Sequence, residues 1–295
     1  MQLGLGTVQF GLDYGVSNAH GRTPENEVRQ ILKLAADKKI RILDTAAAYG
    51  ESEDVLGRCL PPGADFSIVT KTRPLKAARG TVAATTIVRE GFNASLKHLK
   101  VSTVYGLLVH HAEDLLGPGG DDIWAWLLER KSSGQVERIG ISVYDGAQID
   151  LALDRYDFDI IQLPLNVLDQ RLVVGGQLAR LKQRGVEIHA RSVFLQGLLL
   201  MEPGQMPGYF SPVIPHLVRW RSVLESKGLT PAQGAFAFLR SIDATDVVLI
   251  GVESISQLER NISEFSDAYV ADIDFHSFAV NDDRFINPGN WRLNG

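Results

Sequence analysis

Short apolar runs rich in β-branched residues alternate along the chain with amphipathic stretches. The apolar runs are continuous, which is typical of strands buried on both faces of a parallel sheet. They predict eight strands, at residues 3–7, 40–45, 67–71, 104–110, 138–143, 160–163, 187–191 and 246–250. Helical periodicity predicts the intervening helices, at residues 24–39, 51–60, 81–99, 121–134, 146–155, 171–185, 216–241 (interrupted near Gly228) and 255–265.

Capping residues support several of these helix starts. Thr23 places a hydroxyl before Pro24, which suits the first position of a helix. Thr230 and Gln233 have the spacing of a capping box. Asp145 can accept from the first backbone N–H groups of the helix predicted from residue 146.

Eight strand-then-helix units predict an α/β fold of the (β/α)8 TIM-barrel type. No linker divides the chain, so we expect one domain over residues 1–295, with a tail at 272–295 that packs on or over the barrel. A doubly wound sheet is the alternative that the same alternation allows. It is disfavoured because Gly4 and Gly6 are not followed by the third glycine of a dinucleotide-binding fingerprint.

Charge and cysteine usage narrow the possible functions. Thirty Lys and Arg against 35 Asp and Glu give a net charge of −5, which argues against a general binder of nucleic acid or anionic membranes. Cys59 is the only cysteine, so no intrachain disulfide forms and a reducing compartment is favoured. We find no metal-ligand spacing, no signal-peptide pattern and no apolar run of about 20 residues. We therefore expect a cytoplasmic protein without a metal site.

Four polar side chains at strand ends suggest proton-transfer chemistry. Asp44, Lys71 and His110 end apolar strands, where a barrel places its active site, and Tyr49 follows in a loop of small residues. A free phenol has a pKa of about 10, too high for efficient proton exchange at neutral pH. We expect Lys71 to lower the pKa of Tyr49, Asp44 to keep Lys71 charged, and His110 to orient a carbonyl oxygen. Because this set cannot supply hydride, it implies a nicotinamide cofactor.

An ordered series of motifs makes a family resemblance specific. The motifs are LDTAAAYGESEDVLG, IVTK, LLVHHAED, RIGISVYD, IIQLPLNVLD and IGVESISQLERN. Together they resemble the aldo-keto reductase superfamily from about residue 3 to residue 261. The catalytic tetrad of that family matches Asp44, Tyr49, Lys71 and His110.

The resemblance implies NADP(H) or NAD(H) as cofactor, bound across the barrel mouth. The matching residues, from the nicotinamide end to the adenosine end, are Gly6, Thr7, Asp44, Ser142, Gln162, Arg191, Ser192, Phe194, Gly197, Gly251, Glu253, Ser254, Gln257 and Asn261. Val143 stands where many members have Asn, and Arg191 where an aromatic residue commonly stacks on the nicotinamide. Glu253 lies in a stretch that often carries Lys or Arg for the 2′-phosphate, so we expect a weaker NADP preference.

These features favour an NAD(P)-dependent oxidoreductase that interconverts an aldehyde or ketone and its alcohol. The tail FHSFAVNDDRFINPGNW resembles members found among bacterial surface-polysaccharide genes, which suggests a sugar-like substrate. A Schiff-base lyase using Lys71 and a cofactor-binding redox sensor are the alternatives. Loop 201–215 and tail 272–295 are candidates for covering the substrate. Direction of reaction and oligomeric state stay open.

Overall fold

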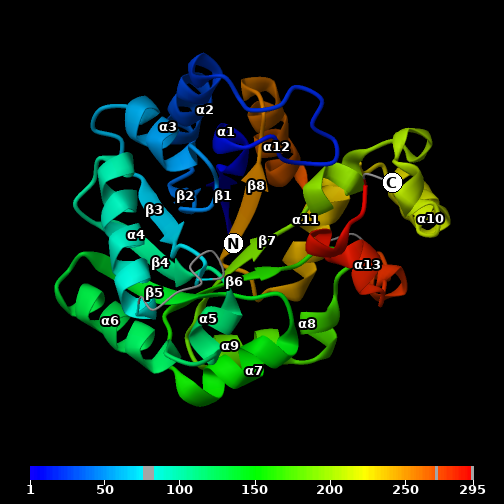
Figure 1. Ribbon diagram of the computed structural model, residues 1–295. Coiled ribbons are helices and arrows are strands. Elements are labelled where there is room, and N and C mark those ends of the chain that lie inside the picture. Colours follow the sequence, from blue (N-terminus) through cyan, green and yellow to red (C-terminus); the bar gives the residue numbers. More distant parts are fainter. Residues whose placement is uncertain (76–82, 270–271, 294–295) are drawn as a thin grey trace.

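Eight parallel strands close into a barrel in chain order. The computed structural model describes residues 1–75, 83–269 and 272–293. The strands are β1 (Gln2–Gly6), β2 (Ile42–Asp44), β3 (Ser67–Lys71), β4 (Val104–Val109), β5 (Val136–Ser142), β6 (Ile160–Pro164), β7 (Glu187–Arg191) and β8 (Val247–Gly251). Strand β1 pairs with both β2 and β8, which closes the ring. The predicted (β/α)8 barrel is confirmed, and it forms a single domain (Figure 1).

Helices surround the strands on the outside of the barrel (Figure 1). The principal ones are α2 (Glu25–Asp37), α3 (Ser52–Cys59), α4 (Ala84–Leu99), α6 (Gly120–Ser132), α7 (Gly146–Arg155), α9 (Gln177–Gln183), α11 (Pro231–Ile242) and α12 (Ile255–Asp267). Shorter or additional elements are α1 (Val8–Gly11), α5 (Ala112–Leu116), α8 (Arg171–Val174), α10 (Ile214–Ser226), α13 (Asp283–Ile286) and the 3₁₀ turns η2 (Leu195–Leu200), η3 (Pro203–Gln205), η4 (Gly208–Phe210), η5 (Phe275–Phe278) and η6 (Pro288–Asn290). None of these described helices is both long enough and apolar enough to cross a bilayer.

A layer of apolar side chains from the strands forms a buried cluster of its own. It consists of Ile42, Val69, Leu108, Ile160, Val247 and Leu249. Side chains two residues apart on a strand share a face. Asp44 therefore follows Ile42 on the same face of β2, and Lys71 follows Val69 on the same face of β3. The polar side chains of Asp44 and Lys71 thus lie one layer above this apolar cluster, at the carboxyl end of the barrel.

Some local predictions need correction. Thr23 does not cap the first long helix: α2 begins at Glu25 after Pro24, and the buried Thr23 hydroxyl has no hydrogen-bond partner among the described residues. The predicted helix 171–185 is broken into α8 and α9 at Gly176, whose φ of 76° interrupts the helical backbone. The predicted start of helix 81–99 lies partly outside the described residues, and α4 begins at Ala84.

Other local predictions are confirmed. Thr230 and Gln233 form the capping box of α11, and the Asp145 side chain accepts from the Gln148 N–H at the start of α7. The interruption near Gly228 separates α10 from α11. These cases follow from local capping chemistry and from the positive φ of 67° at Gly228.

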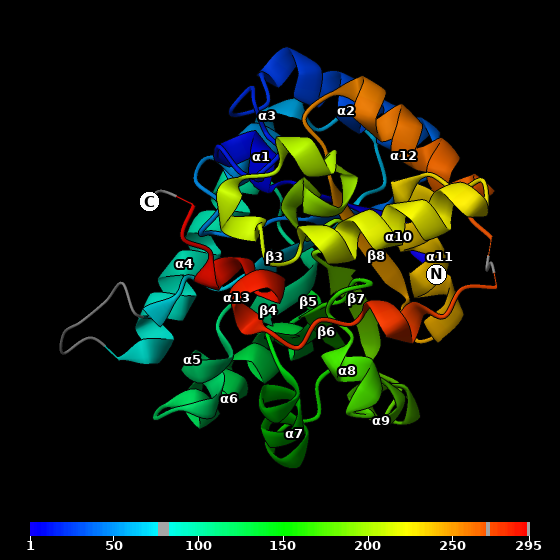
Figure 2. The same ribbon diagram turned by 90° about the vertical axis from the view of Figure 1, so that its right-hand side faces the viewer.

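The C-terminal tail packs against helix α10 and the turn before it (Figure 2). Phe275 and Phe278 contact Trp220, and Trp291 makes an edge-to-face contact with Phe210 at a ring separation of 4.8 Å. These aromatic rings are buried. None of the described tail residues lines the large cavity at the barrel mouth. The tail therefore covers the outer helices rather than the cavity.

A second polar cluster lies at the amino end of the strands. Glu187 accepts hydrogen bonds from the Tyr105 hydroxyl at 2.6 Å and from the buried His189 ring at 2.7 Å, and it pairs with Arg138 at 3.2 Å. Burial alone would raise the pKa of Glu187, but these partners outweigh burial and hold it below 4.5. The cluster joins β4, β5 and β7 at the end of the barrel remote from Asp44 and Lys71.

Candidate active site

Neighbouring strands bring the four predicted catalytic residues together at the carboxyl end of the barrel. Asp44 ends β2 and is in register with Val69 of β3, so Lys71 lies one pleat further along. His110 directly follows β4, and Tyr49 lies in the turn before α3. Parallel strands place their carboxyl ends on one rim, which is why residues distant in sequence meet here.

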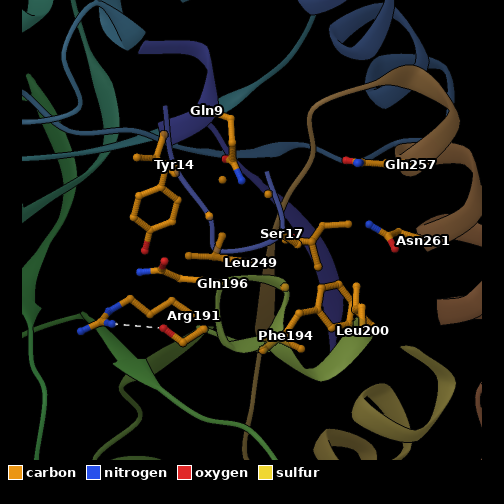
Figure 3. Close-up of a pocket in the computed structure, with 18 of the residues that line it drawn as sticks. Gln9, Tyr14, Ser17, Arg191, Phe194, Gln196, Leu200, Leu249, Gln257 and Asn261 are labelled. Carbon is orange, nitrogen blue, oxygen red and sulfur yellow. Dashed lines mark hydrogen bonds between the residues drawn. The ribbon is translucent and has the colours of Figure 1, made fainter. Parts of the chain in front are cut away.

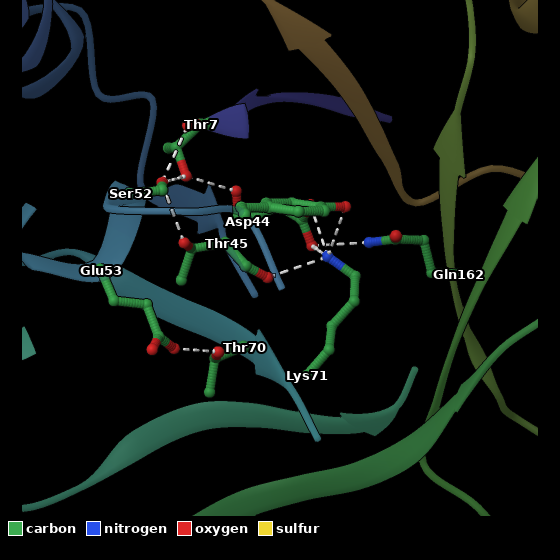
Figure 4. A network of polar contacts seen from close by, with 9 residues as sticks. Thr7, Asp44, Thr45, Ser52, Glu53, Thr70, Lys71 and Gln162 are labelled. Carbon is green, nitrogen blue, oxygen red and sulfur yellow. Dashed lines mark hydrogen bonds and ion pairs between the residues drawn. The ribbon is translucent and has the colours of Figure 1, made fainter. Parts of the chain in front are cut away.

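Lys71 is held at the centre of this group (Figure 4). Its Nζ lies 2.8 Å from both Asp44 carboxylate oxygens, 2.9 Å from the Thr45 carbonyl oxygen and 3.2 Å from the Tyr49 hydroxyl. The Lys71 side chain is 1% exposed. The Gln162 amide donates to Asp44 at 2.6 Å. These contacts fix the ammonium in position, and the Tyr49 hydroxyl oxygen is one of the four oxygens around it.

Hydroxyl groups fix the strand end that carries Asp44 (Figure 4). The Thr7 hydroxyl donates to the Asp44 carbonyl oxygen at 2.9 Å, and the Ser52 hydroxyl donates to the Thr7 carbonyl oxygen at 2.8 Å. All three residues are buried. These bonds join β1, β2 and the first residue of α3, so the turn containing Tyr49 is anchored on both sides.

The pKa of Tyr49 differs from the sequence-based expectation. Burial of the phenol raises its pKa above the ordinary value of 10.0, and Lys71 only partly counteracts this rise. The Asp44 carboxylate adds to the rise because it repels a phenolate. Lys71 acts in the expected direction, but burial outweighs it, so the net shift of the Tyr49 pKa is upward. Tyr49 is a neutral phenol at pH 7, in the form that can donate a proton.

Lys71 is an ammonium at neutral pH. Burial alone would lower its pKa, but Asp44 and Tyr49 outweigh burial and raise the pKa above 10.5. A Schiff-base nucleophile must be the neutral amine. The tight Asp44 contact therefore disfavours the lyase alternative.

His110 is neutral and borders Tyr49. Burial, with added repulsion from Lys71, lowers the pKa of His110 to about 2. Its ring lies edge-to-face with the Tyr49 ring at 5.8 Å, and its backbone N–H donates to the Thr72 hydroxyl at 3.2 Å. The buried Nδ1 has no partner in the described part of the chain. A neutral imidazole retains one N–H, which can donate to an oxygen in the cavity.

A cavity of about 650 Å³ extends from these residues across the barrel mouth (Figure 3). The predicted residues that line it are Gly6, Thr7, Asp44, Tyr49, His110, Ser142, Gln162, Arg191, Ser192, Phe194, Gly197, Gly251, Glu253, Gln257 and Asn261. Two predicted residues do not line it. Lys71 is buried behind the wall, and the Ser254 hydroxyl accepts from the Gln257 N–H at 3.2 Å as the cap of α12. The volume is within the usual range for small-molecule sites.

Several cavity residues carry no sequence signal. Tyr14 lies in the loop after α1, Gln196 lies in η2 at a non-helical φ of 55°, and Tyr144 follows β5. Gln9, on the short helix α1, is buried, and its Oε1 has no partner among the described residues. Its amide packs so closely on Gly251 that a Cβ there would lie 2.4 Å from Nε2. A motif search misses such residues because their position depends on loop conformation.

The segment after β7 has a strained backbone. Positive φ angles occur at Ser192, Leu195, Gln196 and Gly197. The Val16 N–H donates to the Gln196 carbonyl oxygen at 3.1 Å, and a Cβ at Gly197 would lie 1.9 Å from the Ser17 hydroxyl. This segment therefore meets the loop after α1 at the cavity wall. Strained backbone of this kind is concentrated at ligand sites.

Comparisons with known proteins place this barrel in a family. The model of the Aldo/keto reductase family matches residues 2–277, so the chain belongs to that family. It is an NAD(P)H-dependent oxidoreductase that acts on a small carbonyl substrate and uses NADP(H) or NAD(H). It is similar to the L-galactose dehydrogenase of Arabidopsis thaliana, with 26% identity over 90% of this chain and 86% of that protein.

Two solved structures share the fold. An aldo-keto reductase from Bacillus halodurans, in its holo form, has a TM-score of 0.76 at 21% identity, covering 95% of this chain and 93% of the other. The glycerol dehydrogenase of Gluconobacter oxydans has a TM-score of 0.72 at 19% identity, covering 94% and 89%.

The cavity fits a dinucleotide chemically. Gln9 Oε1 and His110 Nδ1 are buried polar atoms without partners in the described residues, and both residues face the cavity. A buried polar atom without a partner costs free energy, which a bound polar ligand can offset. The absence of a side chain at Gly251, at the end of β8, lets the Gln9 amide lie against the backbone at the cavity wall.

Proposed function

We propose that this chain interconverts an aldehyde or ketone and its alcohol, with Tyr49 as the group that gives or takes the proton. The observation that carries the proposal is the 3.2 Å contact between the Tyr49 hydroxyl and Lys71, whose charge is fixed by Asp44. The nicotinamide cofactor, when bound, supplies or receives the hydride. The protein residues position the carbonyl group and donate or accept the proton.

In the reductive direction the neutral Tyr49 hydroxyl donates its proton to the carbonyl oxygen. The phenolate left behind is stabilised by Lys71, which remains an ammonium because Asp44 lies 2.8 Å away. The N–H of neutral His110 donates to the same carbonyl oxygen and orients it. Oxidation of an alcohol runs these proton steps in reverse.

Residues around the rest of the cavity would hold the cofactor. Ser142 and Gln162, at the ends of β5 and β6, would hold the carboxamide. The Gln162 N–H already donates to Asp44, which leaves its carbonyl oxygen as an acceptor. Arg191 stands beside them in the nicotinamide region, residues 192–197 would border the pyrophosphate, and residues 251–261 the adenosine.

We further propose a polyhydroxylated, sugar-like substrate. This is supported by the similarity to L-galactose dehydrogenase over most of both chains. Tyr14, Gln196 and Arg191 give the cavity polar groups that can bond to hydroxyls.

Glu253 is proposed to weaken the preference for NADP(H). It lines the cavity beside Gln257, whose side-chain oxygen accepts from the Glu253 N–H at 2.7 Å. A carboxylate repels a 2′-phosphate and accepts from a free ribose hydroxyl. We expect NADH to bind at least as tightly as NADPH, and Glu253→Gln to improve NADPH binding selectively. Fluorescence titration measures both affinities, and tenfold tighter NADPH binding by the unaltered protein contradicts this proposal.

Replacing Tyr49 by Phe tests the catalytic proposal. General acid catalysis contributes roughly 100- to 10,000-fold, so turnover of an aldehyde panel should fall by at least about 100-fold. Cofactor affinity should stay within about threefold, because the ring is retained. The matched control is Tyr156→Phe, which removes a hydroxyl outside the cavity that lies 2.7 Å from an Asp121 carboxylate oxygen and 3.1 Å from the Leu115 carbonyl oxygen. Full turnover by Tyr49→Phe would overturn the role of Tyr49.

A further inference from the structure

Arg191 carries a charge at the cavity wall that lacks an acidic partner. Its Nη2 donates to the Val143 carbonyl oxygen at 2.9 Å, its Nη1 lies 3.4 Å from the Ser192 hydroxyl, and its guanidinium carbon lies 4.3 Å from the Tyr144 ring centroid. No carboxylate lies within 4.0 Å of it among the residues that the structure describes. The side chain is half-buried. Two neutral oxygens therefore position the guanidinium and leave its charge uncompensated.

The guanidinium belongs to the catalytic end of the cavity. Arg191 lines the same cavity as His110 and Tyr49, and its charge lowers the pKa of His110 and opposes the rise in the pKa of Tyr49. Figure 3 shows Arg191 and Tyr14 on one side of the cavity, with Gln257 and Asn261 on the other. An anion held by Arg191 would therefore lie beside the reacting carbonyl rather than at the adenosine end.

The net charge of this end of the cavity is positive. Asp44 is the acidic residue there, and Lys71 compensates it at 2.8 Å. Glu253 lines the opposite end, next to Gln257. Arg191 is left as the excess charge, and a half-buried excess charge favours an anionic ligand.

Tyr14 adds a neutral donor on the same side. The Tyr14 residue is 36% exposed, but desolvation at the cavity wall, followed by the interaction with Tyr49, raises its pKa to about 12, so its hydroxyl keeps its proton. The Gln196 side chain lies beside that hydroxyl (Figure 3). A planar guanidinium with a nearby hydroxyl suits the oxygens of a carboxylate or phosphate.

We propose that Arg191, assisted by Tyr14, binds an anionic group on the substrate, so that the preferred substrates are carbonyl compounds bearing a carboxylate or a phosphate. This rests on the proposed carbonyl–alcohol interconversion and specifies its substrate class. It also gives Arg191 a role different from the stacking on nicotinamide that the family resemblance implied. Both roles predict sensitivity to substitution, but for different ligands.

Paired substrates, one with an anionic group and one without, test the proposal. One pair is 4-carboxybenzaldehyde and its methyl ester, and the other is glyceraldehyde 3-phosphate and glyceraldehyde, which separates the two sources of anion. A hydrogen-bonded charge pair is worth roughly 10- to 100-fold in affinity. We expect Arg191→Gln to lower kcat/KM for one or both anionic substrates by about that factor, mainly through KM. The ratio of kcat/KM for each anionic substrate to that for its neutral partner is the deciding quantity, and the dissociation constant of the cofactor is measured separately. Arg191→Lys, which keeps the charge, should recover part of the loss.

A binding measurement separates this proposal from the catalytic one. Calorimetry of 4-carboxybenzyl alcohol and glycerol 3-phosphate, with cofactor present, reports anion binding without turnover. Weaker binding to Arg191→Gln, with thermal melting unchanged, supports the anion site even if no carbonyl is reduced. An equal loss for charged and neutral substrates, or a weakened cofactor alone, overturns it. Equal binding of both anions to the variant and the unaltered protein overturns it as well.

Discussion

The Asp44–Lys71 pair should stabilise the barrel only as a pair. Both side chains are nearly inaccessible, at 6% and 1% exposure, and Nζ lies 2.8 Å from each carboxylate oxygen. Asp44→Asn leaves the Lys71 ammonium buried without a counter-ion, and Lys71→Met leaves a buried carboxylate. Removing one partner of a buried ion pair costs about 3 to 5 kcal/mol. Asp44→Asn should also lower the pKa of Lys71, because burial then acts without the opposing charge.

The double variant shows whether the two charges stabilise each other or whether each substitution lowers the free energy of unfolding independently. Asp44→Asn with Lys71→Met removes both charges, so neither is left buried alone. Its free energy of unfolding should exceed the value expected from adding the two single losses by at least about 2 kcal/mol. The contact of Lys71 with the Thr45 carbonyl oxygen, at 2.9 Å, is lost both in Lys71→Met and in the double variant, so it cancels from this comparison.

Urea unfolding monitored by tryptophan fluorescence and circular dichroism measures these differences. An exposed pair supplies the control: Arg22 and Glu51 are also 2.8 Å apart, but their side chains are 50% and 65% exposed. Arg22→Gln should cost no more than about 1 kcal/mol. The reasoning is refuted if the two single losses add within about 0.5 kcal/mol in the double variant. It is also refuted if Asp44→Asn costs no more than Arg22→Gln.

Two further predictions concern regions away from the catalytic residues. The pKa of Glu187 is held below 4.5, so its contribution to stability is present above that pH and is lost as the pH falls through the folded-state value; urea midpoints between pH 6 and pH 3 should fall less steeply for Glu187→Gln, and identical slopes would contradict this. Phe278→Ala removes a buried ring that makes an edge-to-face contact with Trp220 and should cost about 3 to 5 kcal/mol. Cofactor affinity should be unchanged because Phe278 does not line the cavity; a large change in the dissociation constant would show that the tail reaches the site.

The barrel could be predicted because buried strands require continuous apolar runs in the sequence. Parallel strands are covered on both faces, so runs such as residues 247–250 are apolar throughout. The placement of Asp44 and Lys71 follows from the same fact, since a polar residue ending such a run must lie at the rim. Capping by Thr230 was predictable because it depends on neighbours within four residues.

Features that depend on long-range contacts could not be predicted in this way. Gln9 and Tyr14 line the cavity because the loop after α1 folds against residue 196, 180 or more positions further on. The direction of the Tyr49 pKa shift depends on the balance between burial, Lys71 and Asp44, and only a three-dimensional arrangement fixes that balance. Thr23 has the local pattern of a cap, but its hydroxyl is buried away from the helix start.

The anchoring of Asp44 has a consequence for how this protein could diversify. Thr7 and Gln162 donate to Asp44, and Ser52 donates to the Thr7 carbonyl oxygen. Together with Lys71 they form a frame that involves neither residues 12–22 nor residues 192–201. Mutations in those two segments can therefore reshape ligand selection while the proton-handling groups keep their spacing. Substitutions that change specificity, in nature and in laboratory evolution, should occur first in these two segments, while the catalytic residues stay unchanged.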